Sequence, residues 1–171
     1  MICEIMPIEN IPSVYLQTEY SILICKLSYT QKNESDPFIN IQFKMKSTTE
    51  ENNIVKSVIE KIIKNKCSVT QINIEFVEIK KGVDILSVYI NAFGAVAKLA
   101  NLDVMDDIIA GSFTKGEYQA CVTYLVKEKT IINLYFNGPV DLKEVMSECE
   151  KEAEKNEKFL KLELKKFYEK K

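Results

Sequence analysis

Short stretches of alternating hydrophobic and polar residues recur along the chain, and this alternation predicts β-strands. It runs over residues 20–30 and again over residues 38–45. The residues between them, 31–37, include asparagine, aspartate and proline, which are typical of turns. We therefore expect a β-hairpin here. The same alternation predicts further strands over residues 71–80, 108–113, 118–126 and 130–137.

Three other segments place their hydrophobic residues at helical spacing. Residues 54–63 form one apolar stripe, which predicts an amphipathic helix lying on a sheet, and Thr48 and Glu51 have the spacing of a capping box. Residues 84–100 are apolar nearly all round and rich in alanine, so we expect a helix buried between layers. From Asp141 onward one long amphipathic helix is expected. The predicted order is β-β-α-β-α-β-β-β-α, an α+β fold.

The composition is that of a globular protein. The chain has 171 residues, of which 46% are hydrophobic and 28% charged, and this fits one domain of ordinary size. Its net charge of −2 gives no basic excess to attract nucleic acid, so any such contact is expected to be local and weak. The apolar runs are shorter than a membrane span and the N-terminal residues do not resemble a signal peptide, so we expect an intracellular protein without a membrane partner.

The cysteines favour neither a disulfide framework nor a zinc site, because their number is odd and no two have C-x-x-C spacing. We interpret them as small buried hydrophobic residues. No metal site is expected from them. They are Cys3, Cys25, Cys67, Cys121 and Cys149.

All 23 basic residues are lysine, and the chain has neither arginine nor histidine. Without histidine there is no Ser-His or Cys-His nucleophile pair and no His-containing metal site. Without arginine no side chain can hold a phosphate with a planar, bidentate guanidinium group. AT-rich coding sequence and a relaxed catalytic constraint both explain this composition, and the sequence leaves the two open.

Residues 84–111 resemble the central helix and following strand of RNase PH-like domains. The helix is rich in alanine and contains the triplet Ile90-Asn91-Ala92, and the strand ends in small residues. The later order of three strands, a glycine turn and a long terminal helix is also similar, so the resemblance spans about residues 20–171. It implies an RNase PH-like fold, also called ribosomal protein S5 domain 2-like, with a mixed sheet packed against helices. We expect one such domain over residues 1–171, shortened at its N-terminus.

Active members of this family degrade RNA by phosphorolysis, which needs cationic groups for phosphate and carboxylates near the scissile bond. The resemblance places the phosphate-binding position at Leu86, beside Ser87, and the catalytic aspartate position near Ala120. Leucine cannot bind phosphate, and no aspartate occurs between Asp107 and Asp141. We therefore expect no catalytic residues, no metal, no cofactor and no enzymatic activity.

The function that the resemblance implies is structural. It is that of a catalytically inactive subunit of the eukaryotic RNA exosome core, which takes part in RNA processing and degradation, including that of ribosomal RNA. Residues 156–168 are similar to the end of a small non-catalytic subunit. The implied partners are other RNase PH-like subunits in a hetero-oligomeric ring, and the implied locations are the nucleus, the nucleolus and the cytoplasm.

Single-stranded RNA is expected to bind weakly, or only within the complex. Lysine pairs could contact its phosphates as point charges, although lysines that only keep the surface soluble are the alternative. Two other functions stay open, an unrelated α+β protein-interaction module and an active phosphorolytic 3'-5' exoribonuclease. The candidate RNA contacts are Lys44, Lys46, Lys80 and Lys81, with a further pair at Lys127 and Lys129.

Overall fold

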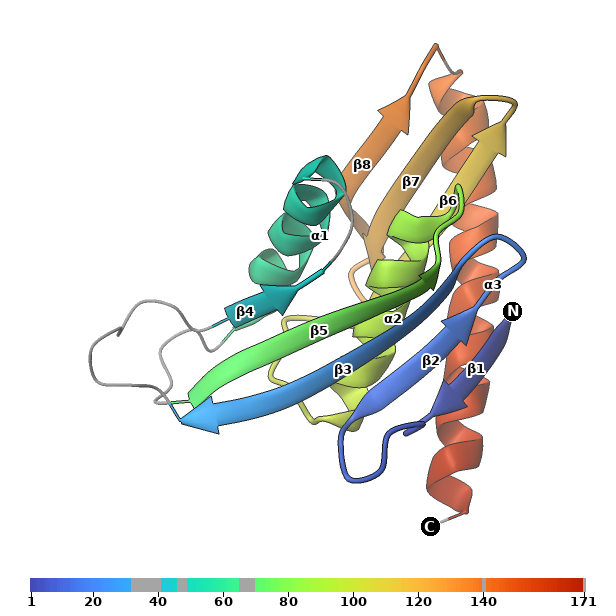
Figure 1. The fold of residues 1–171 in the computed structure, drawn as a ribbon. Helices are drawn as coiled ribbons and strands as arrows, with labels where there is room; N and C mark the ends of the chain where they lie inside the picture. Colours follow the sequence, from blue (N-terminus) through green and yellow to red (C-terminus); the bar gives the residue numbers. More distant parts are fainter. Residues whose placement is uncertain (32–40, 46–48, 65–69, 140, 171) are drawn as a thin grey trace.

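Two sheets and three helices make up the computed structural model, which describes residues 1–31, 41–45, 49–64, 70–139 and 141–170 (Figure 1). The predicted α+β class with a long C-terminal helix is confirmed. The helices are α1 (Thr49–Ile62), α2 (Ile85–Leu99) and α3 (Leu142–Glu169). The strands are β1 (Ile2–Ile5), β2 (Ser13–Gln17), β3 (Ile22–Gln31), β4 (Ile41–Lys44), β5 (Thr70–Lys80), β6 (Ile108–Lys115), β7 (Tyr118–Leu125) and β8 (Thr130–Asn137).

The larger sheet is mixed, with the strand order β1-β2-β3-β5-β4. The hairpin predicted between residues 20–30 and 38–45 is wrong, because β5 lies between β3 and β4 (Figure 1). Ile74 of β5 faces Leu27 of β3 on one side and Phe43 of β4 on the other. β4 runs parallel to β5, and a parallel pair needs a crossover, which α1 supplies. Residues 38–40 of the second predicted strand lie outside the described residues.

Two strands that the sequence analysis missed precede β3. β1 and β2 have only four and five residues, too few to show a clear alternation. Between them Met6 and Asn10 adopt positive φ angles of 59° and 62°, which mark a tight, irregular connection. Val14 and Leu16 of β2 are fully buried, so β2 belongs to the core, and the half-buried Cys3 and Ile5 of β1 pack against it. The shortened N-terminus stays a prediction.

Helix α2 is the buried centre of the molecule, as its composition predicted. It packs against β2 and β3 of the larger sheet on one side and against β6 and β7 on the other. Its largest side chains, Tyr89 and Phe93, are fully buried. The ring of Tyr89 meets that of Phe76 edge to face, with 4.8 Å between the ring centres. α1 packs beside α2, and its Lys56 lies over the ring of Phe43 on β4, so the predicted placement of this helix on a sheet is confirmed.

The smaller sheet is antiparallel, with the order β6-β7-β8, and side chains close its β6 edge. Asn91 of α2 donates to the carbonyl oxygen of Ala110 at 3.0 Å and accepts from the Ala110 N–H at 2.7 Å. Asn156 of α3 donates to the same carbonyl oxygen at 3.1 Å. Glu152 accepts from both the N–H and the hydroxyl of Ser112. These polar side chains therefore satisfy the edge of a strand that no neighbouring strand covers.

Helix α3 lies across β6 and β7, and Figure 1 shows it passing beside both sheets. Its buried positions follow the predicted apolar stripe, except that Leu142 is 52% exposed. None of the described helices is both long and apolar enough to cross a membrane.

The cysteines inside the described part of the chain are free thiols. Cys25, Cys121 and Cys149 are buried, which confirms their interpretation as small buried hydrophobic residues, whereas Cys3 is only half-buried. Burial, reinforced by Glu152, raises the pKa of Cys149 to about 12, so this thiol stays protonated near neutral pH. Cys67 lies outside the described residues.

Candidate functional site

The tight turn between β5 and α2 positions the start of the helix. A side chain at Gly82 would lie 2.5 Å from the Cβ atom of Tyr20, so only glycine fits between the two segments. The hydroxyl of Ser21 accepts from the Gly82 N–H at 3.0 Å and donates to the Asp84 carboxylate at 2.5 Å. The Asp84 side chain therefore links the helix to the residue just before β3 instead of capping the helix N–H groups.

A small pocket lies where this helix start meets the three-stranded sheet. Its volume is about 20 Å³, close to the space that one water molecule needs. The structure brings Leu86 and Ser87 of α2 together with Ala120 of β7 in this pocket. The positions singled out by the family resemblance therefore meet. The lining residues are Glu51, Val83, Asp84, Ile85, Leu86, Ser87, Ser112, Gln119, Ala120, Cys121 and Tyr135.

The inner side chains of the pocket offer little to a phosphate ion. Leu86 and Ala120 are 7% and 3% exposed and have no polar group. The Ser87 hydroxyl donates to the Asp84 carbonyl oxygen at 2.9 Å, so its hydrogen is already in use. Burial raises the pKa of the Cys121 thiol, which leaves it protonated and a poor nucleophile.

Acidic residues from the first turn of α1 lie at or near the rim of the pocket. Glu51, from the first turn of α1, pairs with Lys81 at 2.6 Å. Burial, together with the charges of Glu50 and Glu51, raises the pKa of Tyr135. Lys81 is therefore engaged by a carboxylate, and the acidic residues at the start of α1 lie close enough to act on Tyr135 of the pocket. The capping-box partner predicted for Glu51, Thr48, lies outside the described residues.

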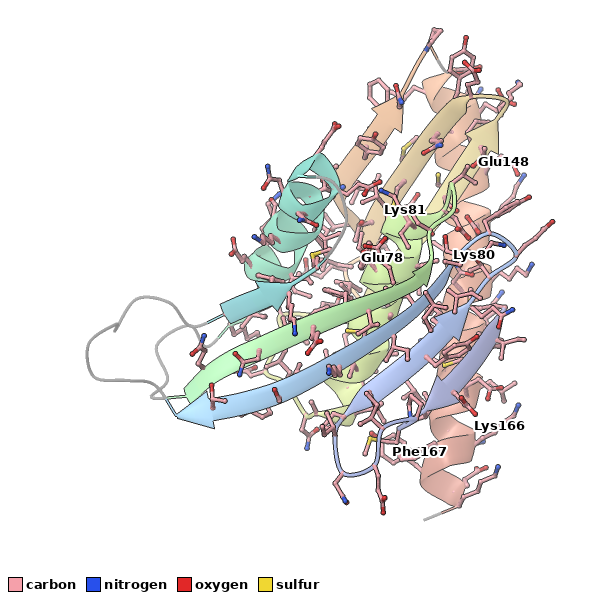
Figure 2. The ribbon with its side chains drawn as sticks, in the orientation of Figure 1. Glu78, Lys80, Lys81, Glu148, Lys166 and Phe167 are labelled. Carbon is pink, nitrogen blue, oxygen red and sulfur yellow. The ribbon has the colours of Figure 1, made fainter. Side chains whose placement is uncertain are left out.

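The predicted RNA-contacting lysines do not form one cluster. Figure 2 shows Lys80 and Lys81 near the end of β5, where the chain turns into α2. The Lys80 ammonium group donates to the Glu19 carbonyl oxygen at 3.0 Å, and Lys81 is paired with Glu51. Lys44 lies on β4 opposite Glu75 of β5. Glu75 precedes Lys80 by five residues along β5, so Lys44 lies about 17 Å from Lys80. Lys46 lies outside the described residues.

The remaining lysine pair lies at the other end of α2. Lys127 and Lys129 belong to the turn between β7 and β8, and the backbone N–H of Lys127 donates to Asp106 at 2.8 Å. The length of α2 separates this turn from Lys81, a distance of about 22 Å. The described candidate lysines thus lie in three separate places, with Lys44 sharing Glu75 with Lys26.

Sequence reasoning missed the side chains that hold the strands around the pocket. Asn156 had a local signal, because it is a polar residue at a buried position in the apolar stripe of α3. Glu152 had none, because its bonds to Ser112 join residues 40 positions apart. In the part of the chain that is described, no three Cys, Asp or Glu side chains gather closely enough to hold a metal ion.

Comparison with solved structures identifies the fold. The rice (Oryza sativa) protein Rrp46 superposes with a TM-score of 0.77 over 96% of this chain and 93% of its own, at 13% sequence identity. This is the fold of RNase PH-like exosome subunits. An archaeal exosome core structure matches with a TM-score of 0.67 over 94% of this chain and 86% of its own, at 16% identity.

The RNase PH-like fold recurs in an Archaeoglobus fulgidus exosome with RNA bound to its active site. It matches with a TM-score of 0.66 and 14% identity, and covers 92% of this chain and 87% of the other. No family model matches the sequence. No curated protein matches it either. The fold expected from residues 84–111 and from the order of the later strands is therefore confirmed by structure and not by sequence similarity.

Proposed function

We propose that the chain is a catalytically inactive RNase PH-like subunit of an RNA exosome core ring, most like ribosomal RNA-processing protein 46. The observation that carries this proposal is the match to rice Rrp46 over nearly the whole of both chains. The subunit would contribute to RNA processing and degradation by completing the ring with other RNase PH-like chains. Its proposed places of action are the nucleus, the nucleolus and the cytoplasm.

The chemistry of the pocket at the start of α2 supports inactivity. Phosphorolysis needs a cation to hold phosphate and a carboxylate beside the scissile bond. Leu86 and Ala120 line the pocket at the positions where the resemblance places these groups. No lysine is among the described residues that line the pocket, and Lys81, the partner of the lining residue Glu51, is held in that ion pair. An incoming phosphate would therefore meet apolar side chains and, among the described lining residues, no cation to hold it.

The purified chain is expected to release no nucleoside diphosphate from single-stranded RNA in the presence of phosphate and magnesium. The measurement is chromatography of the products after incubation at several protein concentrations, beside a buffer control. Phosphate-dependent release that follows the protein through purification would show an active enzyme and contradict the proposal. Release of nucleoside monophosphate, with or without phosphate, would instead indicate a hydrolase and would leave the expected absence of phosphorolysis standing.

RNA binding is proposed to depend on assembly. The isolated chain has a net charge of −2, and its described lysines are divided between distant places. Lys44, Lys46, Lys80 and Lys81 stay the proposed contacts, and Lys81 would exchange Glu51 for a phosphate. A few lysine–phosphate contacts give weak, salt-sensitive binding, whereas a partner subunit would add further positive groups along the same strand.

The chain should co-purify with RNase PH-like chains, and the assembled ring should bind a labelled oligonucleotide more tightly than the chain alone. In the ring, a Lys80→Ala/Lys81→Ala variant should reduce the slope of log affinity against log salt by about 0.7 for each phosphate that is no longer neutralised. Fluorescence anisotropy over a range of salt concentrations measures both quantities.

A Lys158→Ala/Lys165→Ala variant is the matched control, because it removes the same charge from two exposed side chains of α3 that are not among the candidate RNA contacts. It should leave the salt slope unchanged. Equal effects of the two variants would remove Lys80 and Lys81 from the proposed contacts. Tight, salt-resistant RNA binding by the isolated chain, without any RNase PH-like chain in the purified complex, would overturn the assembly proposal.

A further inference from the structure

A second cavity lies at the C-terminal end of α2, away from the small pocket where that helix starts. Residues from the last turn of α1, the end of α2, the loop that follows α2 and the start of β6 line this cavity, and its volume is about 320 Å³. Ligand pockets commonly have volumes of about 300–1,000 Å³, so this space is large enough for a small ligand. The proposed function gives the cavity no role.

Most of the cavity lining is apolar. Phe93 and Ala97 of α2 and Ile108 of β6 belong to it, and each is at most 5% exposed. Leu102 and Val104, two half-buried residues of the loop between α2 and β6, add further apolar side chains. The hydrocarbon part of a ligand would therefore be stabilised by leaving water for this cavity.

Hydrogen bonds fasten the loop between α2 and β6 to the ends of two helices. The Leu102 N–H donates to the Ala97 carbonyl oxygen of α2 at 2.9 Å. The Met105 N–H donates to the Ile62 carbonyl oxygen of α1 at 2.7 Å. The wall that this loop forms is therefore fixed before any ligand arrives, and binding would cost little ordering of the chain.

The polar part of the lining carries more negative than positive charge. The Asp107 carboxylate lies 2.9 Å from the Lys98 ammonium group, and the two side chains are 25% and 33% exposed. Asp106 is 3% exposed, and its carboxylate accepts three backbone N–H bonds but has no lysine partner among the described residues. α2 ends at Leu99 beside these groups, and the C-terminal end of a helix carries a partial negative charge. Among the described lining residues, two carboxylates therefore accompany one ammonium group.

We infer that this cavity is a binding site for a small aliphatic ammonium ion. The hydrocarbon chain of the ligand lies against Phe93, Ala97 and Ile108, and its ammonium group donates to the Asp107 carboxylate. Lys98 already pairs with that carboxylate and repels a second positive charge, so Lys98 competes with the ligand. An anionic ligand would have only Lys98 to bind and would meet both carboxylates. This inference concerns the chain alone and is independent of the proposed place in an exosome ring.

Titration of the isotope-labelled chain with hexylammonium chloride, followed through its amide NMR signals, tests the inference. The signals of Ala97, Leu102 and Ile108 should shift with a dissociation constant of about 1 mM or below, as expected for a ligand of few heavy atoms. The signal of Leu86, at the other end of α2, should not shift. Hexanol and sodium hexanoate are the matched probes, because they keep the carbon chain and change only the charge. Hexanol should bind more weakly than hexylammonium, and hexanoate should not bind.

Two variants break the same ion pair and should change the affinity for hexylammonium in opposite directions. Asp107→Asn removes the anionic acceptor and should raise the dissociation constant about tenfold. Lys98→Met removes the competing charge, keeps an apolar stem of similar length and should lower the constant about threefold. If breaking the ion pair only loosened the cavity, both constants would change in the same direction.

Thermal melting verifies that each variant is folded, and Asp107→Gln replaces Asp107→Asn if the latter is not. The absence of any saturable shift up to about 10 mM hexylammonium overturns the inference. Equal binding of hexanoate, or a change of both constants in the same direction, overturns it as well. Co-purification with RNase PH-like chains bears only on the exosome proposal, so the two can fail separately.

Discussion

A Gly111→Ala variant is expected to lose about 3 kcal/mol or more of its free energy of unfolding, because the added methyl group has no room. The new Cβ atom would overlap the carbonyl oxygen of Cys149 and lie 2.7 Å from the carbonyl carbon and 2.9 Å from the Ala153 nitrogen. All three atoms belong to the backbone of α3, so no rotation of a side chain relieves the overlap. α3 must move away from β6 as a unit.

That movement would weaken several interactions at once. The bond from Asn156 to Ala110 and the bonds from Ser112 to Glu152 all join α3 to β6 near Gly111. The apolar contact of Val145 and Cys149 with β7 depends on the same position of α3 against the sheet. Urea denaturation followed by circular dichroism measures the loss as a lower midpoint.

Gly116→Ala is the control for this measurement. Gly116 has a φ angle of 62° in the turn between β6 and β7, and a side chain there would meet no atom within 4 Å. Only the backbone strain remains, which costs about 1 kcal/mol. If Gly111→Ala unfolds at the same urea concentration as Gly116→Ala, α3 does not pack against β6 as closely as the distances at Gly111 indicate.

The local pattern of hydrophobic residues was sufficient to predict the bounds of an element where that element is long and its surroundings are uniform. α2 begins at Ile85 and ends at Leu99, within one residue of the predicted 84–100, because burial on all sides made the whole run apolar. β7 likewise matches its predicted range to within one residue. The alternation also located β3, but it could not identify the neighbour of that strand. Pairing is set by the crossover through α1, which is a property of the whole fold.

The candidate site was predictable only in part for the same reason. The positions Leu86 and Ala120 came from resemblance to a family, and no periodicity relates residues so far apart in the chain. The pairing of Glu51 with Lys81 joins residues 30 positions apart, and it depends on how α1 is placed over the end of β5. Charge at the pocket rim therefore becomes visible only once the chain is folded.

Polar side chains inside the core form hydrogen bonds to the β6 edge of the smaller sheet, and replacing them measures how much these bonds stabilise the fold. Asn91 is 1% exposed, and its side chain satisfies both the N–H and the C=O of Ala110. A buried side-chain amide in an otherwise apolar helix is unfavourable unless both its carbonyl oxygen and its NH2 group form hydrogen bonds. Closing the β6 edge is the structural role of this asparagine, and β8 has no counterpart among the described side chains.

An Asn91→Leu variant should therefore lose about 2–3 kcal/mol of unfolding free energy, because the buried Ala110 N–H is left without a partner. The matched control is Asn156→Leu. Asn156 is also buried and donates to the same carbonyl oxygen, but it makes no bond to the Ala110 N–H. Its loss should cost about 1 kcal/mol, since Asn91 still donates to that oxygen.

The double variant separates the two roles of Asn91. With both asparagines replaced, the Ala110 carbonyl oxygen loses its last side-chain donor as well, so the combined loss should exceed the sum of the single losses. Hydrogen exchange gives an independent readout, because the Ala110 amide should exchange faster in Asn91→Leu and keep its protection in Asn156→Leu. Equal losses of stability and equal exchange in the two single variants would show that Asn91 does not close this edge, and that both asparagines act only by filling space beneath α3.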